Sequence, residues 1–269
     1  MTRIASRLTL AALTTAVVTA SALPARAQAS TPKPAKPAAS AVAPAPSRFR
    51  LILNASFWPT KTSFSDSRTF TEYAEPTTIH TSYEAGSALG PDAALQVSLF
   101  HGLGLLVGYS YVSRDVSGQV EVSRPHPLYL NRPRSASAGL SGYGLAQGAL
   151  HFDLAYARAA GHLDWALFAG ATLFQVEADL LGKPTYDEAY PYDELAITAT
   201  PSTAVTDSPA GFNVGGRLDY RFGRSRRFGA GMQALFSSAS VKLKAGKDAT
   251  EATFDAGGLS VGAGLRVYF

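Results

Sequence analysis

Apolar and polar residues alternate along several segments of this sequence, most clearly in GLSVGAGLRVYF at residues 258–269. Successive side chains of a β-strand point to opposite faces, so this spacing predicts a strand with one apolar and one polar face. Helical periodicity is missing, and eight segments share the alternation: residues 49–59, 93–100, 105–122, 147–158, 163–180, 210–222, 228–244 and 255–269.

Charged residues avoid one of the two faces. Within these segments, forty outward positions hold no Asp, Glu, Lys or Arg, although such residues make up 16% of the chain. These positions are every second residue of 49–57, 93–99, 105–111, 150–156, 163–173, 212–222, 228–236 and 259–269. A soluble β-sandwich would also sort its residues, but it would cover the apolar face with a second sheet. Here the other face is Gly, Ser, Ala, Asn and Gln with a set of charges, which suits the crowded lumen of an eight-stranded barrel whose apolar face meets lipid. The predicted lumen charges are Arg50, Asp153, Asp164, Arg217, Asp219, Arg221 and Arg266.

The connections between the segments alternate between short and long. Residues 101–104, 159–162 and 223–227 form tight turns, whereas residues 60–88, 123–135, 181–209 and 245–254 form longer loops. If the strands run up and down, the short turns lie at one end of the barrel and the long loops at the other, as in bacterial outer-membrane barrels. We therefore predict an all-β fold for residues 48–269: an eight-stranded antiparallel up-and-down transmembrane β-barrel, monomeric, in the cell outer membrane of a Gram-negative bacterium.

The N-terminal region predicts export. Arg3 and Arg7 precede an uncharged stretch, and Ala25-Arg26-Ala27 supplies the small residues of a cleavage site, so residues 1–27 are expected to be a signal peptide. A membrane anchor is the alternative, but the stretch is short and rich in Ala and Thr. Residues 28–47 are rich in Ala, Pro and Lys, which is typical of a disordered periplasmic tether.

Composition excludes several functions. The chain has no cysteine, so disulfides, thiolate metal sites and a lipidated cysteine are excluded. The net charge of +4 does not resemble a nucleic-acid footprint. No cofactor or metal is expected.

Aromatic residues gather at two levels about a membrane thickness apart, as in the two interfacial girdles of outer-membrane barrels. The level near the short turns holds Tyr156, Trp165, Tyr220, Phe222, Phe228, Tyr268 and Phe269, and the other holds Phe57, Trp58, Tyr109, Tyr111, Phe174 and Phe236.

With these features the chain resembles the small eight-stranded outer-membrane barrels, the OmpA/OmpX/OmpW-like group described as "outer membrane protein β-barrel domain". In that group a terminal strand ending in Phe is the signal read by the barrel assembly machinery. The resemblance therefore implies that Leu265, Val267 and Phe269, with Tyr268 beside them, form an assembly signal. It implies the fold more strongly than the function, because members act as tethers, adhesins, hydrophobic-solute pores or enzymes.

Two places depart from the pattern. Gly90-Pro91-Asp92 interrupts what would be a longer second strand, so we expect a bulge or a late strand start there. Val241 and Leu243 fall on the lumen side while Lys242 and Lys244 face outward, so either the register slips or the strand has left the membrane.

Three groups of residues could carry chemistry. His151 and Asp153 share the lumen face and could form half of a hydrolytic triad or a proton relay, although a structural pair is the favoured interpretation. YDEAYPYDE at residues 186–194 could gather a divalent cation but matches no calcium-loop signature, which favours a solvated acidic loop. Residues 123–134 could contact lipopolysaccharide phosphate or simply form a stiff proline loop, and the arginines concerned are Arg124, Arg132 and Arg134.

The sequence thus predicts a non-enzymatic integral outer-membrane protein, without catalytic residues, that supports envelope integrity or surface interaction through its extracellular loops. Its expected partners are outer-membrane lipid, lipopolysaccharide and the barrel assembly machinery. A narrow porin-like channel for small or hydrophobic solutes is the alternative, and an outer-membrane lipid hydrolase is a third hypothesis.

Overall fold

The computed structural model describes residues 48–246 and 249–269, so the predicted signal peptide and tether lie outside the described residues. Within the described ranges no helix is long and apolar enough to cross a membrane. The strands are β1 (Phe49–Trp58), β2 (Thr62–Glu72), β3 (Glu75–Ala85), β4 (Ala88–Ser98), β5 (Leu103–Arg124), β6 (Arg134–Ala160), β7 (Leu163–Leu181), β8 (Thr185–Asp187), β9 (Ala196–Ala199), β10 (Ser202–Asp207), β11 (Ala210–Phe222), β12 (Phe228–Leu243) and β13 (Ala252–Tyr268).

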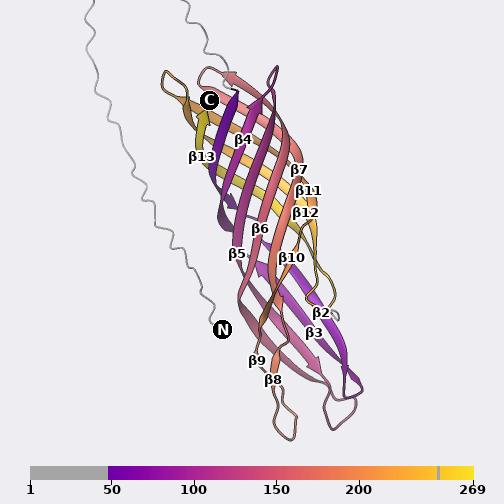
Figure 1. Ribbon diagram of the computed structural model, residues 1–269. Coiled ribbons are helices and arrows are strands. Elements are labelled where there is room, and N and C mark those ends of the chain that lie inside the picture. Colours follow the sequence, from indigo (N-terminus) through magenta and orange to yellow (C-terminus); the bar gives the residue numbers. More distant parts are fainter. Residues whose placement is uncertain (1–47, 247–248) are drawn as a thin grey trace, which may run out of the picture. The chain divides into compact units, whose positions relative to one another are not determined.

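Eight of these strands close into an antiparallel barrel in the order β1, β4, β5, β6, β7, β11, β12, β13 and back to β1 (Figure 1). The closing ladder runs from Arg50 paired with Tyr268 to Phe57 paired with Val261. The predicted eight-stranded barrel and its three tight turns are therefore confirmed. With eight strands the lumen is only wide enough for side chains to fill it.

The remaining strands lengthen the wall beyond the barrel. The β2–β3 hairpin follows β1 and precedes β4, and β3 pairs with the second half of β5. β10 precedes β11 and pairs with β7, while β8 and β9 form a small sheet of their own. We call this part, with the adjoining ends of β5, β6, β7, β12 and β13, the extension; it lies at the end of the barrel that carries the long connections (Figure 1). The prediction that residues 60–88 and 181–209 are loops was therefore wrong.

The expected interruption near Pro91 takes a milder form than predicted. β4 already begins at Ala88, and Pro91 itself pairs with Ala55 of β1. On the other side, pairing with β5 begins only at Asp92, which lies opposite Ser110. Pro91, which has no N–H to donate, thus sits where the β5 ladder is open.

The polarity of the wall reverses along the barrel strands that continue into the extension. At barrel height β5 exposes Leu105, Val107 and Tyr109, whereas in the extension it exposes Ser113 and Asp115. The exposed apolar side chains of the eight barrel strands form a charge-free band, which we call the belt. Beyond the belt the interior becomes apolar, with a buried core drawn from β2, β3, β5, β6, β7, β12 and β13: Phe64, Ile79, Tyr83, Val116, Val120, Val122, Leu140, Tyr143, Leu145, Phe174, Val176, Leu180, Leu181, Val241, Leu243 and Phe254, with smaller alanines between them.

This reversal explains the second departure seen in the sequence. Val241 and Leu243 are fully buried in the extension core, and Lys242 and Lys244 are exposed on its outer surface. The β12–β13 register is continuous up to Leu243, so the register has not slipped. The alternative therefore holds: at these residues β12 has left the lipid-facing part of the wall.

Glycine permits close approach at the barrel closure. A Cβ atom added to Gly264 of β13 would lie 1.8 Å from the carbonyl oxygen of Leu53 and 2.7 Å from the Cα of Asn54 on β1. A side chain at this position would push the first and last strands apart, so closure depends on its absence.

Candidate functional site

The lumen near the short turns is filled by a network of buried charges centred on Asp219 of β11. Its carboxylate accepts hydrogen bonds from Arg50 (Nη1–Oδ2 3.1 Å), Arg217 (Nε–Oδ2 3.1 Å) and Arg266 (Nε–Oδ1 2.6 Å). Asp219 and Arg266 are completely buried. A lone charge in this space would carry several kcal/mol of desolvation cost, so the pairing stabilises every member.

Asp164 of β7 forms the second centre of the network. Its Oδ2 atom accepts hydrogen bonds from Arg50 Nη2 at 3.0 Å and from Arg221 Nε at 2.7 Å. The ring of Tyr268 lies 4.7 Å from the guanidinium carbon of Arg50 and 4.3 Å from that of Arg221. The network therefore spans β1, β7, β11 and β13 and ties the closing strands to the opposite wall.

The sequence missed three members of this network. Arg266 Nη1 donates to Asn54 Oδ1 at 2.7 Å, and Asn54 Nδ2 donates to Asp92 Oδ1 at 2.8 Å. Arg217 also donates to Gln96. Asn54 and Gln96 carry no charge, so the prediction of lumen charges did not include them. Asp92 belongs to Gly90-Pro91-Asp92, where the sequence predicts an interruption of the strand. All three occupy the alternate positions of β1 and β4 that face the lumen, and this alternation is the sequence signal that could have identified them.

The structure brings six of the seven predicted lumen charges together and leaves Asp153 apart. Neither carboxylate oxygen of Asp153 has a hydrogen-bond partner among the residues that the structure describes. Its predicted neighbour His151 bonds elsewhere, with Nε2 3.0 Å from Ser110 Oγ and Nδ1 2.9 Å from Thr172 Oγ1. Asn213 Nδ2 lies 3.0 Å from the same Nδ1 atom.

These contacts do not give a hydrolytic site on the lipid face. Ser110, His151 and Asn213 are all buried inside the barrel, 6%, 3% and 2% exposed respectively. Among the residues that the structure describes, no carboxylate hydrogen-bonds to the imidazole in the way a triad requires. A lipid chain outside the wall does not meet this histidine, so the arrangement fits a structural cluster that joins β5, β6, β7 and β11.

A second group of ion pairs lies at the far end of the extension, in what we call the cap: residues 72–75, 124–134 and 182–200. Arg124 Nε donates to Glu72 Oε2 at 2.6 Å, and its Nη1 atom contacts Glu188. Arg134 Nη2 donates to Glu188 Oε2 at 3.2 Å and to the carbonyl oxygen of Pro125 at 3.1 Å. The three chain segments of the cap are thereby held to one another.

Burial and hydrogen bonding shift the pKa of the cap residue Glu72 in opposite directions. Burial alone would raise the pKa of Glu72, but hydrogen bonds from Arg124 and Thr77 outweigh it and lower the pKa below its ordinary value. Glu72 is therefore held in its charged form, which suits its role as a partner of Arg124.

The three arginines of the predicted lipopolysaccharide contact form ion pairs within the cap, and the contact itself stays a prediction. The side chains of Arg134 and Arg124 are only 4% and 15% exposed and are engaged by Glu188 and Glu72. Arg132 is more exposed, at 60%, but pairs with Asp193. Arg124 also lies 13 residues beyond Tyr111, about 30 Å above the belt for a tilted strand, which is far from lipid phosphate.

The acidic segment at residues 186–194 is used in the same ion pairs. Glu188 and Asp193 face arginines of the neighbouring loop. Among the described residues no three His, Cys, Asp or Glu side chains are placed to hold a metal ion.

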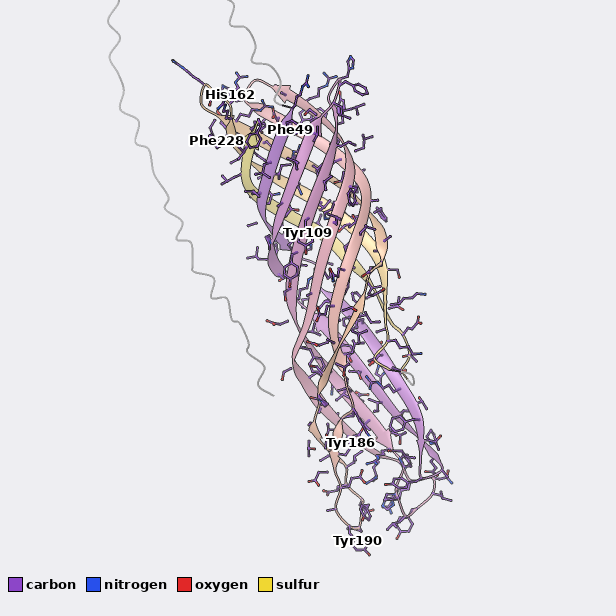
Figure 2. All side chains as sticks on the ribbon, in the orientation of Figure 1. Phe49, Tyr109, His162, Tyr186, Tyr190 and Phe228 are labelled. Atoms are coloured by element: carbon purple, nitrogen blue, oxygen red, sulfur yellow. The ribbon has the colours of Figure 1, made fainter. Side chains whose placement is uncertain are left out.

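Most of the predicted aromatic girdle residues lie on the lipid side. Near the short turns Trp165, Tyr220, Phe222, Phe228 and Phe269 are exposed, and at the other level Phe57, Tyr109, Tyr111 and Phe236 are exposed. Figure 2 shows Phe49, Phe228 and Tyr109 on the barrel wall. Three predicted girdle residues instead point inward and are buried: Trp58, Phe174 and Tyr268.

The terminal strand divides its residues between the two faces. Leu265 and Phe269 are 63% and 65% exposed on the belt, Val267 is half-buried, and Tyr268 lies in the lumen beneath the arginines. The predicted assembly signal is thus an exposed apolar edge next to the closing ladder, and its role stays a prediction.

Comparison with known proteins identifies the fold. No family model and no curated protein sequence matches the chain. The crystal structure of the outer-membrane protein OprG from Pseudomonas aeruginosa matches with a TM-score of 0.50 at 13% identity, over 83% of this chain and 96% of that chain. The chain has the fold of a small outer-membrane β-barrel. The charge-free belt is the surface that such a barrel presents to lipid.

Two further structures overlap more loosely. Neisserial surface protein A matches with a TM-score of 0.39 at 10% identity, over 82% of this chain and 97% of that chain. Ail, the attachment invasion locus protein of Yersinia pestis, matches with a TM-score of 0.33 at 10% identity, over 82% of this chain and 99% of that chain.

Proposed function

We propose that the protein is a non-conducting, non-enzymatic outer-membrane barrel that holds a rigid interaction surface away from the cell, and that this surface is the outer face of the cap. The observation that carries the proposal is the distribution of exposed apolar side chains on the extension. Among the described residues of the extension, the large exposed apolar side chains all lie in the cap, where Tyr73, Leu128, Tyr129, Leu130 and Tyr190 are between 49% and 80% exposed. Exposed apolar groups gathered at one place outside a membrane are typical of a contact surface for another macromolecule.

The walls of the extension provide the contrast. Their outward residues are mainly hydroxyl, amide and charged side chains, such as Ser65, Thr78, Gln119 and Ser137. Lipid does not reach the cap, so the exposure of its aromatic residues has no explanation in membrane insertion. Tyrosine and leucine next to a paired Arg132 and Asp193 are a composition found at protein–protein interfaces.

The cap residues are fixed in place. The guanidinium of Arg132 lies 5.7 Å from the ring of Tyr129, and the N–H of Asn131 donates to Glu75 Oε1 at 2.6 Å. Together with the arginine pairs of the cap, these contacts order the apolar side chains before a partner binds, which lowers the entropic cost of association. Figure 2 shows Tyr190 at the end of the extension that lies away from the barrel.

The interior supports the non-conducting part of the proposal. A solute crossing the barrel would have to pass the Asp219 network and then the packed apolar core, and both consist of buried side chains. A single-file polar path through both layers would need many of these groups to move at once.

The experiment combines conductance with cross-linking in cells. A photo-reactive amino acid is placed at Tyr190 or Leu130 in the cap, and at Ser137 or Gln119 on the wall as matched exposed controls. We expect discrete adducts from the cap positions only, and no steady current from the wild-type barrel in a planar bilayer. Adducts from the wall positions but not from the cap positions would overturn the proposal that the cap is the contact surface. A steady conductance would show that the lumen network and the apolar core do not block the barrel, and would establish the channel alternative.

A further inference from the structure

The far ends of β12 and β13 differ from the rest of the extension wall. Residues 239–243 and 252–256 pair with each other from Ala239 opposite Ala256 to Leu243 opposite Ala252. We call this two-stranded segment the flap. Its inner face is apolar and completes the extension core through Ala239, Val241, Leu243, Ala252, Phe254 and Ala256.

The flap lacks a backbone ladder along its β12 edge. The ladder between β11 and β12 ends where Phe212 lies opposite Ser238. Beyond that point β10 takes the place of β11, and β10 pairs only with β7 among the described strands. Among the described residues one hydrogen bond crosses this seam: the Lys242 N–H donates to Asp207 Oδ2 at 2.9 Å.

The β13 edge is open in the same way. The ladder between β1 and β13 ends at Phe57 opposite Val261, and β2 pairs only with β3 among the described strands. Here the flap is held by stacking of Phe254 on Phe64, with ring centroids 4.7 Å apart, and by polar contacts just beyond its end. There the Thr250 N–H donates to the Ser67 carbonyl oxygen at 2.8 Å, the Ser67 N–H donates to Thr250 Oγ1 at 2.9 Å, and Arg68 of β2 forms an isolated β-bridge with Ala249.

A pair of glycines marks the base of the flap. Gly257 and Gly258 of β13 have φ angles of +92° and +94°, a conformation that residues with a side chain rarely adopt. They lie opposite Ser238 and Ser237 at the level where the β11 ladder stops. A Cβ atom added to Gly257 would lie 2.5 Å from the Ser237 carbonyl oxygen, so this position depends on glycine.

We propose that the flap is a hinged segment that turns outward about Gly257 and Gly258 while the rest of the extension stays folded, and so uncovers the apolar core of the extension at the cell surface. Segments with few cross-strand hydrogen bonds open at a lower free energy than fully laddered ones. Two edges without a ladder along residues 239–243 and 252–256, a glycine base, and polar contacts limited to Lys242 on one side and to residues 249–250 on the other occur together here and at no other described wall strand. This inference is independent of the cap proposal, because it concerns the interior and not the contact surface.

Cysteine labelling tests the flap, because the chain has no native cysteine. Val241→Cys places a thiol on the inner face of the flap, and Val120→Cys places one on the inner face of β5, where strands pair on both sides; both valines are fully buried. In folded protein in liposomes, we expect N-ethylmaleimide to modify Val241→Cys at least about tenfold faster than Val120→Cys. The heat-modifiable gel shift of each variant verifies that the barrel has folded.

A disulfide across the open seam provides the second arm. The Ser67 Oγ atom on β2 lies 3.3 Å from the Thr250 Oγ1 atom just beyond the flap, so the two side chains face each other across the seam. Ser67→Cys/Thr250→Cys, oxidised in the Val241→Cys background, should slow labelling to the rate of Val120→Cys. The matched Ser82→Cys/Gln119→Cys pair, within the β3–β5 ladder, should leave the rate unchanged. Equal slow labelling of both valine variants would overturn the proposal, as would fast labelling that the seam disulfide does not slow. If the cysteine variants do not fold, hydrogen exchange of wild-type protein decides: protection of the β12–β13 ladder amides of the flap equal to that of residues 116–122 would also overturn it.

Discussion

Asp219→Asn should cost more stability than any other isosteric single substitution in the lumen charge network. Asp219 accepts hydrogen bonds from Arg50, Arg217 and Arg266, and it is fully buried. The amide oxygen of asparagine can still accept one or two of these bonds, but the negative charge is gone. The remaining partner carboxylate, Asp164, already serves Arg50 and Arg221.

The magnitude follows from the burial of the partners. Breaking a buried, hydrogen-bonded ion pair by removing one member costs about 3–5 kcal/mol, because the other charge stays buried without compensation. Since asparagine retains part of the hydrogen bonding, we expect a loss of about 3–4 kcal/mol in the free energy of unfolding. With a denaturant dependence of about 3 kcal/mol per molar urea, the unfolding midpoint falls by about 1 M.

The matched control is Glu84→Gln. It breaks the pair between Lys61 and Glu84, whose side chains are 73% and 57% exposed, and should therefore cost less than about 1 kcal/mol. The assay is urea unfolding of both variants in liposomes, followed by the heat-modifiable gel shift. A loss for Asp219→Asn no larger than that for Glu84→Gln would refute the role assigned to the network.

Three further outcomes are expected. Deleting Phe269 removes an exposed apolar residue of the closing strand, so unassembled protein should accumulate in the periplasm; a wild-type yield of folded barrel would contradict the assembly role. Burial raises the pKa of Asp66 in the extension, so the folded state favours the neutral form of this carboxyl group. The stability of the extension should therefore be greatest below the ordinary carboxyl pKa and should fall as the pH rises through the raised pKa. Asp66→Asn should abolish this pH dependence, as measured by proteolysis of the extension at a series of pH values. An epitope tag at Tyr190 should bind antibody on intact cells and a tag in residues 159–162 should not; the reverse result would invert the topology.

The barrel was predictable because lipid selects residues strictly. Every belt position must be uncharged, so the strand pattern is visible from the sequence alone. The lumen charges were visible for the same reason, since they stand out against an otherwise uncharged wall. The neutral members Asn54 and Gln96 were not, because nothing distinguishes a lumen amide that donates to a charge from one that merely fills space.

The extension could not be predicted in the same way. β2 alternates Ser63, Ser65 and Ser67 outward with Phe64 and Asp66 inward, a weak pattern that also suits a polar loop. Its strand conformation comes from pairing with β3, and that hairpin is in turn ordered by β5. Likewise the first half of β6, SASAGLSGYG, has little apolar alternation and becomes a strand through its ladder with β5. Tertiary pairing outweighs local propensity in both places.

The same alternation of inward and outward side chains continues from the barrel into the extension. Along β12 the inward residues keep the same parity from Gln233 and Ser237 in the barrel to Val241 in the extension, and the outward residues change from Met232 to Lys242. A one-residue slip would have exchanged the two faces. The strand instead stays in register and changes composition where its solvent changes from lipid to water. A polar lumen is stable inside an apolar belt only if its charges pair, and an apolar core is stable inside a polar wall only if the wall excludes water. A single substitution in the Asp219 network or in the flap is therefore expected to destabilise this arrangement more than a substitution elsewhere in the wall.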